Sequence, residues 1–300
     1  MERQILKLDS IDAYNRFYGL PTSHPLASVV DLKKARQWPN HFTVEYGIYA
    51  LFLKNNVACS LRYGRRNYDY QAGTIVSFSP GQTVDVDMVE AEVKPDVVGL
   101  LFHPDLIYGT PLADKIKDFS FFDYAEVESL HLSDEERGKF LFCLDQVRDE
   151  LEHPVDNHSS ALISANIQLL IEYLHRFYDR QFITRHKVNS DVVANFVRQV
   201  KDHVSRPQNQ LPGVAYFAEK ANLSPGYFSD LVRKETGTSP KDIITLHLIE
   251  AAKFRLASLN DDISEIAYTL GFEYPAHFSR MFKRVTGLSP KEFRTKVTLN

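Results

Sequence analysis

The 300-residue sequence predicts an α+β protein with a barrel or sandwich of short strands, then two helices, then an all-α C-terminal part. Three observations predict it. Apolar and polar residues alternate with period two from His41, helical periodicity runs from Ser133 to Phe182, and the last third of the chain contains two similar helical segments. The length suffices for two domains, each with its own hydrophobic core.

Residues 1–132 are expected to form the strand domain. Prolines at positions 21, 25 and 39 argue against long regular elements before residue 40. The alternation that begins at His41 and ends near Leu53 indicates one long strand or a bent pair of strands. Many short strands at a spacing of roughly ten residues are typical of a barrel or sandwich. Further strands are expected at four later runs: Ala58–Tyr63, Gly73–Ser79, Thr83–Val89 and Val97–Phe102.

Aromatic side chains are dense in this strand region and lie near several arginines. A small barrel encloses room for one ligand, and rings with a few cations suit a sugar, an aromatic molecule or a carboxylate. Plain core packing with solvated arginines is the alternative for each of these residues. The side chains expected to line an effector site are Trp38, Tyr46, Phe52, Arg62 and Phe78.

The strand region lacks the pattern of a metal-dependent enzyme. Such sites need two histidines one residue apart, then a carboxylate and a later histidine. The sequence has no His-x-His, and His41, Glu45 and His103 are the nearest approximation. It also has no Ser-His-Asp arrangement and no phosphate-binding glycine loop, so we expect no enzyme activity, no metal and no cofactor.

The cysteines and the N-terminus indicate a cytoplasmic protein. Cys59 and Cys143 are far apart, and neither belongs to a C-x-x-C pair. The first residues lack the apolar core of a secretion signal, and no apolar run approaches the roughly 18 residues that a membrane span requires. We expect both cysteines to be structural, with redox sensing as the alternative.

Residues 133–182 are expected to form two helices. Ser133 and Glu136 have capping-box spacing, and His153 with Pro154 ends the first helix. The second helix is apolar on more than one face, which predicts two packing partners: the strand domain and something else. Residues 183–190 are polar and basic, and we expect them to be a linker.

Residues 191–300 are expected to contain two helix-turn-helix units, of which the later one has the clearer signals. Its first helix begins after Asp262, which has capping-box spacing to Glu265, and ends near Gly271. Its second helix runs from Pro275 to Gly287. The predicted buried stripe of this second helix is Phe278, Met281, Phe282 and Val285, and the predicted polar and basic face is Ala276, Ser279, Arg280, Lys283 and Arg284.

A helix of this kind fits the major groove of DNA. Its N-terminal part meets base edges, and its arginines and lysines meet phosphates or guanines. An ordinary helical pair with a solvated charged face is the alternative for this unit taken alone. The earlier segment Leu211–Asp242 repeats the pattern at an offset of about fifty residues, with one residue of slippage in the turn.

Both copies end in T-G-x-S-P-K, and a helix over Lys241–Leu259 is expected between them. Such a helix spans roughly 28 Å, close to the roughly 34 Å between successive major-groove faces. The charge distribution agrees with a DNA-binding C-terminal part. From residue 191 onward the chain has 15 Lys and Arg against 12 Asp and Glu, a net charge of +3, whereas the preceding part has 20 against 27, a net charge of −7.

Residues from about Asp191 to Lys296 resemble the DNA-binding domain of the AraC/XylS family of bacterial transcription regulators, most specifically between Ile263 and Arg294. The resemblance implies base-facing positions near the start of each second helix. Asp230 departs from the family, in which many members carry a cation there. The aspartate repels phosphate but can accept a hydrogen bond from cytosine N4. The later unit is therefore expected to do more of the base reading, while the earlier one contributes mainly through Arg233 and Lys234.

The residues expected to contact DNA are Pro225, Gly226, Tyr227, Ser229, Asp230, Arg233, Lys234, Pro275, Ala276, His277, Ser279, Arg280, Lys283 and Arg284. The resemblance further implies a cupin-like barrel for residues 1–132 and a homodimer contact through residues 133–182. The alternative for those helices is that they only cover the barrel.

The sequence therefore predicts a sequence-specific DNA-binding transcription regulator that responds to a small-molecule effector. Its expected partners are double-stranded DNA, the effector and a second copy of the chain, and a contact with RNA polymerase is left open. Two other hypotheses remain. The N-terminal domain serves only for dimerisation or protein docking, or it is a metal-dependent enzyme fused to a DNA-binding domain.

Overall fold

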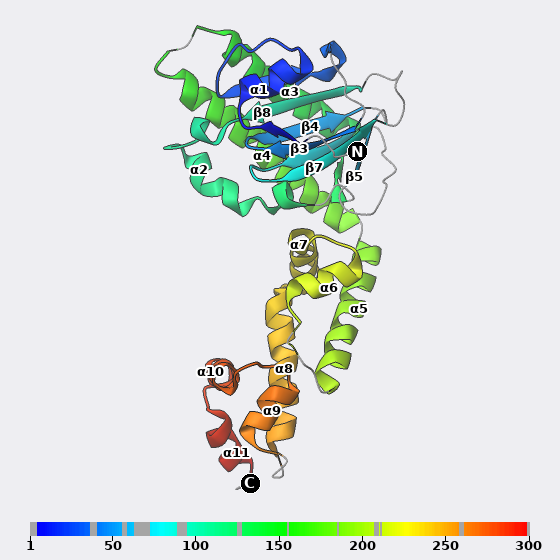
Figure 1. The fold of residues 1–300 in the computed structure, drawn as a ribbon, viewed down its shortest axis with the longest axis vertical. Coiled ribbons are helices and arrows are strands. Elements are labelled where there is room, and N and C mark those ends of the chain that lie inside the picture. The colour runs from blue at the N-terminus through cyan, green and yellow to red at the C-terminus, as the bar shows by residue number, and fades with distance from the viewer. Residues whose placement is uncertain are drawn as a thin grey trace. The chain divides into compact units, whose positions relative to one another are not determined.

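The computed structural model describes residues 5–36, 41–55, 59–62, 73–88, 95–124, 128–154, 156–184, 186–206, 210, 212–257 and 261–298. The contacts divide the chain into two compact units, Met1–Thr184 and Arg185–Asn300. The described strands lie in the first unit and the described elements of the second unit are helices, so the predicted α+β class is confirmed (Figure 1).

The strands of the first unit form two sheets. The four-stranded sheet has the order β1 (Ile5–Leu8), β3 (His41–Tyr46), β7 (Thr83–Met88) and β5 (Cys59–Arg62), with β1 parallel to β3 and the other pairs antiparallel. The five-stranded sheet is antiparallel. Its order is β2 (Ala27–Asp31), β8 (Val97–Phe102), β4 (Tyr49–Lys54), β6 (Thr74–Phe78) and β9 (Leu130–His131).

The alternating segment from His41 to Leu53 is a bent pair, because β3 and β4 belong to different sheets. Gly47 lies at the corner. A Cβ atom there would stand 2.7 Å from the Asp9 Cα, and the Gly47 amide donates to the Leu8 carbonyl at 2.9 Å. Only glycine permits this close approach of two backbone segments, so the residue fixes the point at which the chain crosses from one sheet to the other.

The two sheets enclose one hydrophobic core. One period-two set, Phe42, Val44, Tyr46, Ile48, Ala50 and Phe52, enters this core together with Val76, Phe78, Val84 and Leu101. Helix α1 (Ile11–Tyr18) adds Ile11, Tyr14 and Tyr18 to the same core. This helix begins at the Ser10 N-cap and ends at Gly19, which has φ +66°. One of the two alternating sets of side chains therefore faces the opposing sheet.

The opposite face of the five-stranded sheet is covered by α3 (Asp134–Glu152) and α4 (Ser159–Thr184). Leu51 and Leu53 of β4 and Leu100 of β8 pack in one cluster with residues of both helices, such as Phe140 and Leu170. Ser133 caps α3 and forms the predicted capping box with Glu136. Both helices thus cover the strands, and α4 includes the first two residues of the predicted linker 183–190, since it ends at Thr184.

Short helices connect β8 to β9. They are η2 (Pro104–Leu106), α2 (Pro111–Lys115), η3 (Ile116–Asp118) and η4 (Ser120–Asp123). A further short helix, η1 (Leu32–Lys34), follows β2. Phe121 and Phe122 in η4 are buried in the cluster between the five-stranded sheet and α4. Helix η4 therefore forms part of the core.

The second unit consists of α5 (His186–Ser205), α6 (Val214–Ala221), α7 (Pro225–Thr236), α8 (Pro240–Ala257), α9 (Ile263–Thr269), α10 (Pro275–Thr286) and α11 (Pro290–Thr298). Figure 1 shows α8 running between the α6–α7 pair and the α9–α10 pair. Helix α8 has 18 residues and is therefore about 27 Å long.

The predicted repeat is present in the backbone geometry. Asn222 after α6 and Gly271 after α9 both have positive φ, 58° and 86°. One residue separates Asn222 from the N-cap of α7, and two separate Gly271 from that of α10, which is the predicted slippage. Helices α7 and α10 also end alike, at Gly237 with φ 72° and at Gly287 with φ 79°. None of the described helices is long and apolar enough to cross a membrane.

Candidate nucleic-acid interface

Helix α10 presents a cationic surface. It begins at Pro275, where the missing amide leaves no helical hydrogen bond unmade, and Phe278 and Phe282 anchor it in the core. Its exposed residues include Arg280, Lys283 and Arg284, whereas no acidic residue occurs between Pro275 and Thr286. The Arg280 Nε donates to the Ala276 carbonyl at a long 3.4 Å. The guanidinium therefore lies along the outside of the helix, where a partner can reach it.

Val285 differs from its predicted place in the buried stripe, since 45% of it is exposed. The core of this unit is completed one turn earlier, where Phe282 meets Phe293 of α11 with ring centroids 5.5 Å apart. Met281 is half-buried. The buried stripe of α10 is therefore narrower than the sequence pattern suggests, and its exposed face is correspondingly wider.

Helix α7 carries a mixed surface. The Ser224 Oγ caps it by accepting from the Tyr227 amide at 3.2 Å, and the Ser229 Oγ donates to the Pro225 carbonyl at 2.7 Å. Asp230 forms an ion pair with Arg233 at 3.5 Å. With Lys234 and Glu235 included, α7 has two cations and two anions, so its formal charge is zero. The two equivalent helices therefore differ sharply in charge.

Most residues expected at DNA lie on the outer surface of their helices. In α7, Pro225, Arg233 and Lys234 are exposed, and Gly226, Ser229 and Asp230 are half-buried. In α10, Ala276, His277, Arg280, Lys283 and Arg284 are exposed, and Pro275 and Ser279 are half-buried. Tyr227 differs from the other members of the set. Only 4% of it is exposed, so its side chain belongs to the core, whereas His277 at the equivalent position is exposed.

Two side chains that hold the helices of this unit together were not predicted from the sequence pattern. Phe196 in α5 meets the rings of Phe217 and Phe228 edge-on, at 5.2 and 5.1 Å, and so fixes α6 and α7 against one another. The Arg294 Nη2 donates to the Asp261 carbonyl at 2.7 Å and its Nε to the Leu256 carbonyl at 3.3 Å. Arg294 thereby joins α11 to the end of α8 and the start of the α9 segment.

The residues expected at an effector site lie partly in the core between the sheets. The rings of Tyr46 and Phe78 stack at 4.8 Å, and Phe52 is 6.2 Å from Phe78. All three side chains are buried. Trp38 lies outside the described residues, and Arg62 belongs to β5 although its side chain is not described. The structure thus brings three of the five residues together, packed against one another.

The residues weighed for a metal site are used differently. The His103 Nδ1 accepts from the Asp105 amide at 3.2 Å, and Glu45 pairs with Lys7 at 3.4 Å. The side chain of His41 is not described. Among the described residues, no group of three or more His, Cys, Asp or Glu side chains is arranged to hold a metal ion. Cys143 is buried between sheet and helices, and this burial raises the pKa of its thiol.

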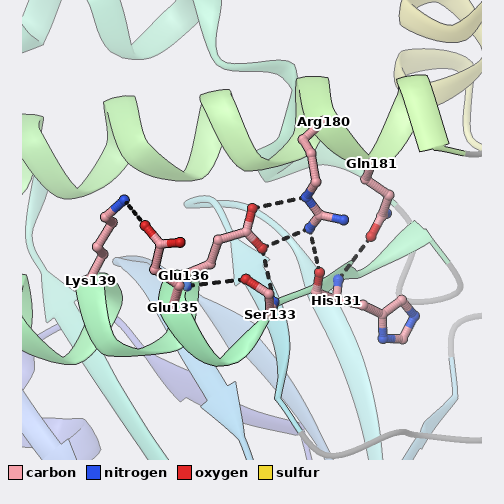
Figure 2. A network of polar contacts seen from close by, with 7 residues as sticks. All are labelled: His131, Ser133, Glu135, Glu136, Lys139, Arg180 and Gln181. Atoms are coloured by element: carbon pink, nitrogen blue, oxygen red, sulfur yellow. Dashed lines mark hydrogen bonds and ion pairs between the residues drawn. The ribbon is translucent and has the colours of Figure 1, made fainter.

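A polar network holds the last turns of α4 in the first unit (Figure 2). The Arg180 Nε and Nη2 donate to the two carboxylate oxygens of Glu136 at 2.9 Å each, and Nη2 also donates to the His131 carbonyl at 2.7 Å. The Gln181 Oε1 accepts from the His131 amide at 2.9 Å. Because Glu136 also accepts from the Ser133 amide, the network joins α4, β9 and the start of α3.

Comparison with known proteins identifies the helical unit. The helix-turn-helix domain family matches residues 217–296. The uncharacterized transcriptional regulatory protein YesN of Bacillus subtilis (strain 168) is 33% identical over 109 residues, which cover 36% of this chain and 29% of YesN. The arabinose operon regulatory protein of Escherichia coli (strain K12) is 30% identical over 128 residues, 43% of each chain.

The chain thus spans less than half the length of these two curated relatives, whose names describe a transcriptional and an operon regulatory protein. A solved structure, the C-terminal domain of the response regulator AraT from Geobacillus stearothermophilus, is 30% identical and covers 35% of this chain and 84% of that one, with a TM-score of 0.32. Residues 217–296 therefore form a helix-turn-helix domain.

Proposed function

We propose that the chain is a cytoplasmic transcription regulator that recognises specific sequences in double-stranded DNA. The observation that carries this proposal is the duplicated pair of helices joined by α8, with a cationic and acid-free second helix in the later pair. Helices of this kind enter the major groove, where side chains near the N-terminus reach base edges. The length of α8, about 27 Å, suits two reading helices in successive turns of one duplex.

In this proposal α7 and α10, the second helices of the two helix-turn-helix units, have different roles at DNA. Helix α10 offers the Arg280 fork to a guanine, while Lys283 and Arg284 neutralise phosphates. In α7, the ion pair between Asp230 and Arg233 lowers the attraction for phosphate. We propose that Ser229 and Asp230 face the base edges and discriminate sequence by hydrogen bonds.

A comparison of charge-neutralised variants tests this function. A triple variant with Arg280, Lys283 and Arg284 replaced by glutamine is expected to lose specific retention of genomic DNA fragments in a filter-binding competition. The matched control replaces Lys139, Lys115 and Arg16, three exposed cations of the first unit, and is expected to bind as the parent chain does. Equal retention of DNA by both triple variants would contradict the proposal.

We further propose that the chain acts as a homodimer through the surface of α3 and α4. Phe142, Leu162 and Leu169 support this, because 44–59% of each side chain remains exposed after the helices have covered the sheet. Apolar groups of this size on neighbouring helices favour a partner. Sedimentation velocity is expected to show a dimer for the parent chain and a monomer for Leu169→Glu, and a monomeric parent chain would contradict this part.

The first unit is proposed to sense a small molecule. A scaffold that serves only for dimerisation is the second candidate, and the packing of Tyr46, Phe52 and Phe78 favours it for the space between the sheets. Sensing requires that the ligand bind two arrangements of the protein with different affinity, a coupling of about 1–3 kcal/mol. A shift in operator affinity upon addition of ligand separates the two candidates.

A further inference from the structure

A cavity of about 410 Å³ lies in the first unit, outside the core between the sheets. It opens at one end of the five-stranded sheet, where β4 begins at Tyr49 and where β6 and β8 end. The connecting segment with α2, η3 and η4 supplies the remaining walls. Its volume lies within the range of about 300–1,000 Å³ that is usual for sites of small ligands.

Aromatic rings form one wall of this cavity and are held in place from behind. The Tyr49 ring stacks on Phe102 at 4.9 Å, with an interplanar angle of 14°, and meets Phe122 edge-on at 5.2 Å. Phe122 itself is buried, and its carbonyl accepts from the Gln82 Nε2 at 2.7 Å. Rings fixed in this way offer a planar ligand a preorganised contact.

The charged groups at the cavity differ in their partners. Asp123 already accepts from the Ser79 Oγ at 3.3 Å and from the Gln82 Nε2 at 3.4 Å. Lys117 is exposed, and within the described part of the chain it enters no ion pair. Burial, with smaller contributions from Tyr108 and Asp123, raises the pKa of Tyr49, so its hydroxyl stays neutral at ordinary pH. The cavity therefore has an unused cation beside neutral rings.

The wall of the cavity also packs against α4. Phe119 lines the cavity and meets the His175 ring at 5.5 Å, and Phe121 stacks on Tyr178 at 5.3 Å. The network of Arg180 and Gln181 follows within the next turn of the same helix (Figure 2). A ligand that displaces Phe119 thus acts on the helix that ends at the boundary of the two units.

We propose that this cavity binds a small aromatic molecule that carries a carboxylate, with the ring against Tyr49 and Phe122 and the carboxylate at Lys117. Binding itself does not depend on the proposed DNA recognition. Only the regulatory consequence, a change at Phe119 and α4, depends on that function.

The test measures binding of 2-naphthoate and of its neutral amide to the full-length chain by fluorescence anisotropy. The parent chain is expected to bind both probes saturably and the carboxylate more tightly. Lys117→Gln should weaken binding of the carboxylate about fivefold, which corresponds to a partly exposed ion pair, and leave the amide unchanged. Lys115→Gln is the matched control, because Lys115 lies two residues away, outside the cavity, and pairs with Glu172. It should bind both probes as the parent chain does.

A second variant, Ala113→Trp, fills the cavity and is expected to abolish binding of both probes. Circular dichroism of each variant shows whether it is folded, and Lys117→Gln decides the question if the tryptophan variant is not. Absence of saturable binding by the parent chain, or equal affinity of both probes for the parent chain and Lys117→Gln, would overturn the proposal. DNA affinity without probe is measured on the same samples, so that failure of DNA recognition is seen separately.

Discussion

Replacing Arg280 by alanine is expected to weaken specific DNA binding while leaving the fold intact. The side chain is exposed on α10, and its Nε lies at a long 3.4 Å from the Ala276 carbonyl. Loss of so weak a contact at the surface should change the free energy of unfolding by less than about 0.5 kcal/mol. Loss of a bidentate contact to guanine costs about 1–3 kcal/mol, a factor of roughly 5 to 150 in the dissociation constant.

The measurement is a fluorescence-anisotropy titration of a preferred duplex and of its scrambled competitor, at one fixed salt concentration because phosphate contacts depend strongly on salt. Arg280→Lys is the control. It keeps the charge and removes the planar fork, so it should bind scrambled DNA as the parent chain does but lack the sequence preference. Thermal unfolding of each variant shows that the fold is retained.

Two results would refute this reasoning. An unchanged dissociation constant and preference would show that Arg280 does not touch DNA. An equal loss on preferred and scrambled duplexes would assign the residue to phosphate rather than to a base.

Three further predictions concern the same surface and the network of α4. Lys283→Ala should weaken binding to all duplexes alike and reduce the slope of log affinity against log salt by about one, and a base-specific loss would contradict its assignment to phosphate. Asp230→Asn should tighten binding to scrambled DNA about two- to fivefold at low salt, since it releases Arg233 and removes a negative charge, and weaker binding would contradict this. Arg180→Ala should lower the free energy of unfolding by about 1–3 kcal/mol in urea titration, because it leaves the mostly buried Glu136 carboxylate without its cation. Lys139→Ala breaks an exposed pair with Glu135. If it lowers the free energy of unfolding as much as Arg180→Ala does, the network of Arg180 stabilises the fold no more than an exposed ion pair.

The helical unit was predictable because its signals are local. Capping residues, Pro275 and the glycines at positive φ set helix boundaries within a few residues of themselves. The repeat shows the same pattern a second time. The alternation between His41 and Leu53 likewise indicated strands, and the bent pair of β3 and β4 is one of the two alternatives that it allowed. Tyr227 was misplaced because sequence position alone does not distinguish a residue at the side of a reading helix from one that turns into the core.

The rest of the first unit depends on long-range contacts. Helix α1 has local signals, a Ser10 cap and a Gly19 stop, but three prolines elsewhere in the first forty residues obscured them. Strand β9 has two residues, and only its pairing with Thr74 and Ile75 of β6 defines it. Arg180 and Glu136 meet across 44 residues of sequence. No periodicity reports contacts of this kind, and the cavity at Tyr49 arises from them.

In-vitro selection of random duplexes by the full-length chain tests the central claim most directly. Two reading helices joined by α8 predict a bipartite motif for each chain, with its two parts about 10 base pairs apart on one face of the duplex. The part read by α10 should lose its sequence preference in Arg280→Ala, while the other part keeps its own. Recovery of no enriched sequence, or of a single short motif unaffected by Arg280→Ala, would contradict the account.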